Sequence, residues 1–177
     1  PQVVTKTDID AGRLRYNPAA NGNGSPYATA TFKVSEDATG TVASIDYTLT
    51  VNVTSVNDAP AGTDNTTAAT NEDVAYTFTA ADFGFTDPND NPDDDFISVQ
   101  VTALSPVGEG TLRLSGTPIS VNAFITRAQI DNGLFTFLPT ANVNGTNIGQ
   151  FSFKVRDGGG TANGGVDLDP TANTINI

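Results

Sequence analysis

The chain contains the stretch Phe151-Ser152-Phe153-Lys154-Val155, in which apolar and polar side chains alternate with a period of two. Successive side chains of a β-strand point to opposite faces, so this pattern predicts a strand with one buried face. Five further stretches alternate in the same way and are rich in Thr, β-branched or aromatic residues: 48–53, 74–79, 97–101, 112–114 and 134–137. Gly, Pro, Asn or Asp residues bound these stretches, as expected of turns. The chain is therefore predicted to be all-β, built as an antiparallel β-sandwich.

An internal repeat organises the chain. Residues 9–34 match residues 130–155 at a constant offset of 121. After that match the offset becomes 124, which aligns Val51-Asn52-Val53 with Ile175-Asn176-Ile177. A loop that differs in length before the last strand would explain the change.

The repeat predicts two sandwich units in tandem. We interpret residues 1–57 as the C-terminal half of a first β-sandwich repeat and residues 58–177 as a second, nearly complete one. The strands of the first part need a facing sheet to cover their apolar side. Either the chain is a slice of a longer array that supplies those strands, or an identical subunit supplies them head to tail, which would produce a fibre.

The composition excludes several classes of function. The 177 residues include no His and no Cys, which removes Ser-His-Asp and Cys-nucleophile catalysis, the usual zinc and iron–sulfur sites, and disulfides. Twenty Asp and Glu residues against eight Lys and Arg give a net charge of −12, which repels nucleic-acid phosphates. No apolar run approaches the ~20 residues that a membrane helix needs. We therefore expect neither nucleic-acid binding nor membrane insertion.

Acidic side chains gather between Lys33 and Arg113, a stretch that has no basic residue. The densest group is Asp82, Asp87, Asp90, Asp93, Asp94 and Asp95. Two carboxylates ~4 Å apart repel by roughly 1 kcal/mol in water and ~4 kcal/mol at an effective dielectric of 20. Since the stability of a protein totals only about 5–15 kcal/mol, closely packed carboxylates need a counter-charge.

Calcium is the natural counter-charge, because it takes six to eight oxygen ligands from carboxylates, amides and carbonyls. In this loop the predicted ligands are Asp87, Asn89, Asp90, Asp93 and Asp95. The loop is not an EF-hand, because a proline replaces the glycine of that motif and a serine replaces its bidentate glutamate. The alternative is a solvated loop that binds no ion.

The sequence also resembles the bacterial cadherin-like and immunoglobulin-like repeats of large surface adhesins and of repeats-in-toxin-type proteins. The pieces that carry this resemblance are Val56-Asn57-Asp58-Ala59-Pro60, Asn71-Glu72-Asp73, Ala81–Asp90, Gly110–Leu114 and Phe153–Gly158. The resemblance implies seven-strand sandwiches in tandem, with calcium bound at the junctions between them. By the same resemblance, the junction ligands would be Asp37, Asn57, Asp58, Glu72, Asp73 and Asp157.

We expect a structural module at the bacterial cell surface or in the extracellular space, not an enzyme. The module would act as a calcium-stiffened spacer or fibre-forming unit in adhesion or biofilm, in contact with neighbouring repeats or identical subunits. The alternative is a module that recognises a surface glycan or a protein through the acidic loop 82–95. Paired carboxylates could also serve glycoside hydrolysis, but the predicted core takes up the aromatic residues that sugar platforms need.

Overall fold

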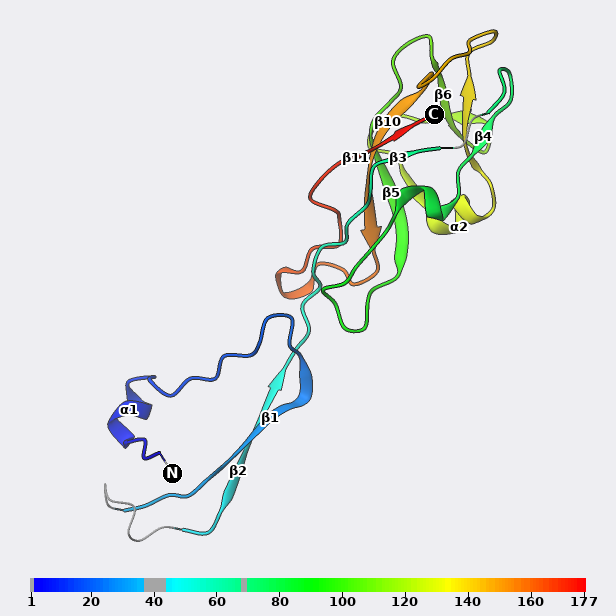
Figure 1. The fold of residues 1–177 in the computed structure, drawn as a ribbon. Coiled ribbons are helices and arrows are strands. Elements are labelled where there is room, and N and C mark those ends of the chain that lie inside the picture. Colours follow the sequence, from blue (N-terminus) through cyan, green and yellow to red (C-terminus); the bar gives the residue numbers. More distant parts are fainter. Residues whose placement is uncertain (1, 37–43, 68–69) are drawn as a thin grey trace. The chain divides into compact units, whose positions relative to one another are not determined.

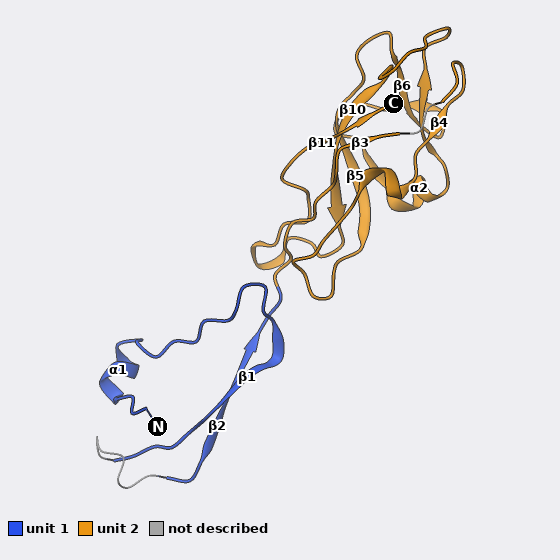
Figure 2. Ribbon diagram, viewed as in Figure 1, with its two compact units in different colours: residues 1–55 blue, residues 56–177 orange. Residues whose placement is uncertain are grey.

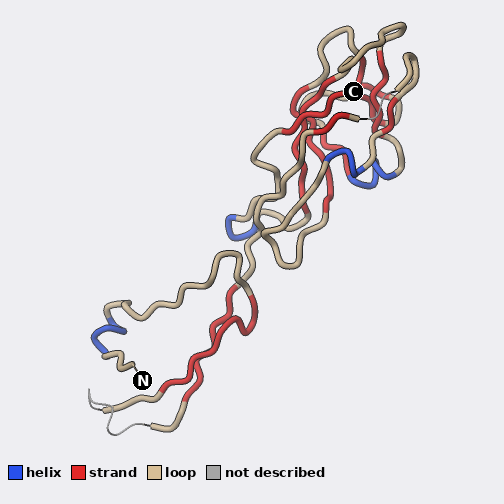
Figure 3. Tube along the Cα trace, viewed as in Figure 1, coloured by secondary structure: helices blue, strands red, loops and turns tan. Residues whose placement is uncertain are grey.

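The predicted alternating stretches contain β-strands in the computed structural model of the protein, although only Tyr76–Thr77 of the stretch 74–79 is a strand (Figures 1 and 3). The structure describes residues 2–36, 44–67 and 70–177. The chain divides into unit 1, residues 1–55, and unit 2, residues 56–177 (Figure 2). Within the described residues, no helix has the length and hydropathy needed to cross a membrane.

Unit 2 is a sandwich of two sheets. Among the described residues, five strands form the first sheet in the order β3 (Asn65–Thr66), β11 (Asn173–Asn176), β10 (Gln150–Asp157), β5 (Phe96–Ala103) and β8 (Phe124–Thr126). In the same part of the chain, four strands form the second sheet in the order β4 (Tyr76–Thr77), β9 (Phe135–Pro139), β6 (Gly110–Leu114) and β7 (Thr117–Pro118). All these pairs are antiparallel except β3 with β11. The predicted all-β antiparallel sandwich is confirmed.

Aromatic side chains from both sheets fill the space between them. Phe151 of β10 lies edge-on to Phe78 and to Phe135 of β9, with ring centroids 5.3 and 6.0 Å apart. Both sheets follow the alternation seen in the sequence: inward residues of β9 and β10 are buried and their neighbours are partly exposed. Edge-to-face pairs of this kind stabilise the core beyond the apolar area that they bury.

Short helical segments join the strands of unit 2. They are the 3-10 helix η1 (Ala80–Phe83), the α-helix α2 (Arg127–Asp131) and the 3-10 turn η2 (Ala162–Gly164). Thr126 caps α2, because its hydroxyl accepts a hydrogen bond from the Gln129 amide while the Gln129 side chain accepts one from the Thr126 amide. Ile130 of this helix is buried in the core.

Unit 1 contains a helix, α1 (Lys6–Asp10), and one antiparallel pair of strands, β1 (Gly24–Phe32) and β2 (Tyr47–Val53). The helix is the counterpart of α2 at the offset of 121 in both its bounds and its cap: Thr5 caps α1 where Thr126 caps α2. The glycines that follow the two helices, Gly12 and Gly133, share a left-handed conformation with φ of +66° and +68°.

Strand pairing corrects the alignment of the last strand of the repeat. Phe151 lies opposite Ile175 of β11, whereas its counterpart Ala30 lies opposite Leu49 of β2. Leu49, not Val51, therefore occupies the position of Ile175, so the offset of this strand is 126, not 124. A shift of two residues keeps the same side chains on the same face, so alternation in the sequence could not distinguish the two registers.

Candidate metal centre

Three carboxylates converge in the loop that precedes β5. One oxygen from each of Asp87, Asp90 and Asp94 lies within 4.8 Å of the others. Asp87 and Asp90 are buried, and Asp94 is half-buried. Of the residues that the structure describes, these form the one group of three or more acids close enough to share an ion.

Main-chain hydrogen bonds hold the loop in this curled conformation. The Asp94 amide donates to Asp87 Oδ2 at 3.1 Å. The amide of Asp58, in the segment at the start of unit 2, donates to Asp90 Oδ2 at 2.9 Å. Paired amide–carbonyl bonds between Ala61 and Thr86, both 2.9 Å, anchor the start of the loop. Two of the three acids are thus fixed by backbone donors.

The end of β10 adds a fourth acid to this region. Asp157 is the last inward position of that strand after Phe151, Phe153 and Val155, so the alternation that buries the core also buries its carboxylate. Its Oδ1 accepts hydrogen bonds from Asn57 Nδ2 at 3.0 Å and from the Gly159 amide at 2.9 Å.

Asn57 ties the segment at the start of unit 2 to this cluster. Its Nδ2 donates to Asp157 and to the Val166 carbonyl, and its own carbonyl accepts from the Val166 amide at 3.0 Å. Gly159 packs so closely against this group that a Cβ atom there would clash with the Asn57 side-chain oxygen and with the Asp94 carboxylate. The side chains of Asn57 and Asp94 therefore meet beside the turn that follows β10.

Three buried oxygens at this place have no hydrogen-bond partner. They are Asn57 Oδ1, Asp87 Oδ1 and Asp157 Oδ2. A buried oxygen without a donor costs about 1–3 kcal/mol, and more when it carries charge. All three belong to one cluster, so this cluster is a candidate cation site.

Two acids of the cluster have raised pKa values. Burial, reinforced by the charges of Asp90, Asp157 and Asp94, raises the pKa of Asp87 to about 6, against the lowering effect of its hydrogen bond from the Asp94 amide. Burial also raises the pKa of Asp157, and the charges of Asp94 and Asp167 add to that rise. The fold therefore holds these carboxyl groups close together, and a bound cation would favour their ionised forms.

The donor set fits a hard divalent cation. Four carboxylates and one amide oxygen offer oxygen ligands alone, and bidentate carboxylates bring such a set into the six to eight oxygens that calcium prefers. Asp87, Asp90 and Asp94 would hold the ion, and Asp157 and the Asn57 side-chain oxygen lie beside them. No nitrogen or sulfur ligand of the kind that zinc favours occurs in the sequence, which has no His and no Cys.

The structure brings some of the ligands predicted from the sequence together and separates others. Asn57, Asp87, Asp90 and Asp157 lie in the cluster, and Asp58 contributes its main-chain amide. The side chains of three others in the same loop are exposed and outside the group of converging carboxylates: Asn89, Asp93 and Asp95. Asp37 lies outside the described residues.

Sequence reasoning omitted Asp94 from the ligands. The intervals between Asp87, Asp90 and Asp94 are three and four residues, which is the spacing of a curled segment, and this signal was present in the sequence.

Glu72 and Asp73 lie at the other end of unit 2. Asp73 Oδ1 accepts from the Asn142 amide at 3.4 Å, and Glu72 Oε2 accepts from Asn144 Nδ2 at 3.3 Å. These asparagines precede β10, whereas Asp157 ends it, and an eight-residue strand is roughly 26 Å long. One ion cannot bind both groups.

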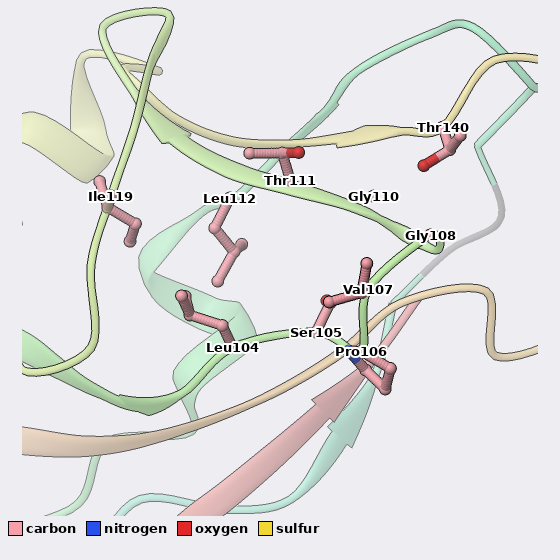
Figure 4. Close-up of a pocket in the computed structure, with 10 residues that line it drawn as sticks. All are labelled: Leu104, Ser105, Pro106, Val107, Gly108, Gly110, Thr111, Leu112, Ile119 and Thr140. Carbon is pink, nitrogen blue, oxygen red and sulfur yellow. The ribbon is translucent and has the colours of Figure 1, made fainter.

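A shallow pocket of about 270 Å³ lies elsewhere in unit 2 (Figure 4). Aliphatic side chains, among them Leu104, Leu112 and Ile119, line it together with a few hydroxyls. None of the described residues that line it carries a charge, and none belongs to the acidic loop. It offers few polar groups to orient a ligand.

Comparison with known proteins gives one match. A family model described as a cadherin-like domain matches residues 56–171, which is most of unit 2 and well over half of the chain. No curated protein and no solved structure gave a significant match.

Proposed function

Because the chain belongs to the family of cadherin-like domains, we propose that it is a calcium-stiffened structural module of an extracellular bacterial adhesin or surface filament. Cadherin-like domains are generally non-enzymatic adhesion modules, are usually extracellular, typically bind Ca²⁺ and interact with adjacent repeats or partner domains. Within that frame the module acts as a spacer or a fibre-forming repeat. The observation that carries the proposal is the buried acid cluster, with its three unpartnered oxygens, beside Asn57.

A bound calcium ion would supply the positive charge that the cluster lacks. Asp87, Asp90, Asp94 and Asp157 would offer carboxylate oxygens, and Asn57 its amide oxygen. The chain holds these groups in place without the ion, through the backbone donors to Asp87 and Asp90. Binding would therefore relieve repulsion that the fold already contains.

Stiffening follows from where the anchors lie. Asn57 and Asp58 belong to the segment at the start of unit 2, and both hydrogen-bond to acids of the cluster. Repulsion among the acids works against these anchors, whereas a shared cation holds the acids and the segment together. Extracellular calcium modules bind at about 10⁻⁴–10⁻³ M, which suits a module that is loaded outside the cell.

Calorimetry with and without calcium tests the proposal. At 10 mM calcium and a dissociation constant of 10⁻⁴–10⁻³ M, we expect stabilisation by about 1.4–2.7 kcal/mol relative to EDTA. Nuclear spin relaxation should show that residues 56–60 become more ordered on the nanosecond timescale. An unfolding transition that calcium leaves unchanged would refute the proposal.

Two matched variants locate the ion. Asp94→Asn should weaken calcium binding at least tenfold, because it removes a charge from the cluster. Asp93→Asn removes a charge from the same loop but from an exposed side chain, so it should leave the affinity within about twofold. The double variant Glu72→Gln with Asp73→Asn should also leave this affinity unchanged, because these side chains lie at the other end of the unit. Equal losses in all three variants would indicate diffuse screening instead of a site.

A further inference from the structure

Unit 1 carries residues of the core type that no other described residue of the same unit covers. The apolar residues Ile9, Leu14, Tyr16, Phe32, Val34 and Leu49 are each between 46% and 59% exposed. Their counterparts in unit 2, by the repeat and the strand pairing, are Ile130, Phe135, Phe137, Phe153, Val155 and Ile175. All six counterparts are at most 1% exposed. The same positions are thus a closed core in unit 2 and an open face in unit 1.

The strand pairing of unit 1 is incomplete at the same places. Residues 14–18 are the counterpart of β9, which pairs with β4 on one side and β6 on the other. Without such neighbours, residues 14–18 form no strand. In the described part of the chain, β1 pairs with β2 alone, whereas its counterpart β10 pairs with β11 and also with β5. Unit 1 therefore lacks both hydrogen-bonding partners and apolar cover.

In unit 2 one continuous segment supplies everything that unit 1 lacks. Residues 56–122 contain β4, β5 and β6, together with the core side chains Phe78, Phe83 and Val99. Residue 122 is the counterpart of residue 1 at the offset of 121. Residues 3–5, as the counterpart of β8, are already present in unit 1.

We propose that unit 1 is the carboxyl-terminal half of a cadherin-like unit, and that its open face binds an amino-terminal half with the strand pattern of residues 56–122, covalently joined ahead of it. A two-stranded hairpin is marginal in water without a covering layer. A detached amino-terminal half would have to order itself on binding, which costs several kcal/mol. Covalent attachment replaces a bimolecular encounter by an effective concentration in the millimolar range, so the joined segment is the favoured occupant.

A second copy of the chain is a poorer match to this face. Its unit 1 would present α1 and the β1–β2 hairpin again, and neither is a counterpart of β4, β5 or β6. Its own β4, β5 and β6 already pair with β8, β9 and β10 inside unit 2. The inference deepens the tandem-repeat part of the proposed function and does not depend on calcium.

An extended chain tests the inference. A duplicate of residues 56–122 is placed ahead of residue 2, where residue 122 of the duplicate takes the place of Pro1. We expect hydrogen exchange at residues 14–18 and in β1 to slow by about 100-fold or more relative to the unextended chain, because new strands pair with both. A second cooperative unfolding transition should appear as well.

Three controls make the outcome specific. The same extension with Val99→Asp and Val101→Asp in the duplicate keeps its length but loses two core side chains, so the protection should disappear. In the intact extension, Phe32→Asp should abolish protection, whereas Thr31→Asp, on the opposite face of β1, should retain it. Exchange that stays as fast as in the unextended chain would overturn the inference.

Sedimentation of the unextended chain tests whether a second copy of the chain binds this face instead. A dimer that Phe32→Asp dissociates would overturn the inference in favour of a second copy. All measurements are run in EDTA and in calcium. Protection in EDTA supports the inference even if calcium has no effect, so its failure is distinguishable from failure of the calcium proposal.

Discussion

Replacing Asp87 by Asn should change the stability of the chain in a calcium-dependent way. In EDTA at pH 7.5 the buried carboxylate of Asp87 is charged and lies near Asp90, Asp94 and Asp157. A pKa raised from 3.8 to about 6 corresponds to about 3 kcal/mol of destabilisation, at 1.36 kcal/mol per pKa unit. Asp87→Asn removes this charge while its side-chain oxygen still accepts from the Asp94 amide. Since the buried amide has its own desolvation cost, we expect the variant to be more stable by about 1–3 kcal/mol.

Calcium should remove most of this advantage. The wild-type chain gains about 1.4–2.7 kcal/mol from 10 mM calcium, whereas the variant has lost a ligand and gains little. The difference between the two proteins should therefore shrink by about that amount. Urea unfolding followed by far-ultraviolet circular dichroism measures both differences, with unchanged m-values as the condition for comparing them.

Asp93→Asn is the matched control, because it makes the same chemical change at an exposed position of the same loop. We expect its stability to stay within about 0.5 kcal/mol of wild type in both buffers. A less stable Asp87→Asn variant in EDTA would refute the repulsion argument. An advantage that calcium does not alter would refute the assignment of Asp87 as a ligand.

Three further outcomes follow from the same geometry. In EDTA the stability of the wild-type chain should fall as pH rises from about 4 to about 6, because folded Asp87 still holds a proton that the unfolded chain has released. Urea melts at several pH values should show this loss, and Asp87→Asn should reduce it but not abolish it, because burial also raises the pKa of Asp157. Gly159→Ala should destabilise the chain by about 1–3 kcal/mol and weaken calcium binding by calorimetry, since a Cβ there clashes with cluster side chains. Gly158→Ala is the matched control, because a Cβ there makes only ordinary van der Waals contacts. Asp169→Ala should lower the free energy of unfolding by about 3–5 kcal/mol in EDTA and in calcium alike, because the buried carboxylate accepts three hydrogen bonds of 2.8 Å. A loss of stability that depends on calcium would instead indicate that Asp169 is a ligand.

The buried acids of unit 2 divide into two kinds that the sequence does not distinguish. Asp169 accepts hydrogen bonds from the Gly62 and Thr171 amides and from the Asn173 side chain, so donors within the fold satisfy its carboxylate. Asp87 and Asp157 each retain an oxygen without a donor. Both kinds are Asp residues beside turns, and only the surrounding donors show which of them retain an unpartnered oxygen.

The strands were predictable because alternation is a local property. A residue of β10 faces inward because its neighbour faces outward, and this follows from backbone geometry without knowledge of any partner. The same rule buries Asp157 after Val155, so one metal-site residue could be placed from periodicity as well as from the resemblance. The cap of α2 is local in the same sense, since Thr126 and Gln129 are three residues apart.

The acidic composition of the loop that precedes β5 was visible in the sequence, but the conformation of its backbone was not. Six acids without a neighbouring base indicate a cation in either an extended or a curled loop. An extended loop would present Asp93 and Asp95, whereas the curl held by the Asp94 and Asp58 amides brings Asp87, Asp90 and Asp94 together.

The sequence by itself determined the all-β fold, the repeat with its offset of 121 and the crowding of acids in one loop, because each depends on residue type and spacing along the chain. Tertiary structure alone decided that Asn57 and Asp157, 100 residues apart, share a hydrogen bond, and that Glu72 and Asp73 lie at the far end of the unit. It also decided which apolar residues of the repeat are covered. Coordination and burial depend on distances through space, and a chain that folds back on itself brings together positions whose separation in sequence carries no information about those distances.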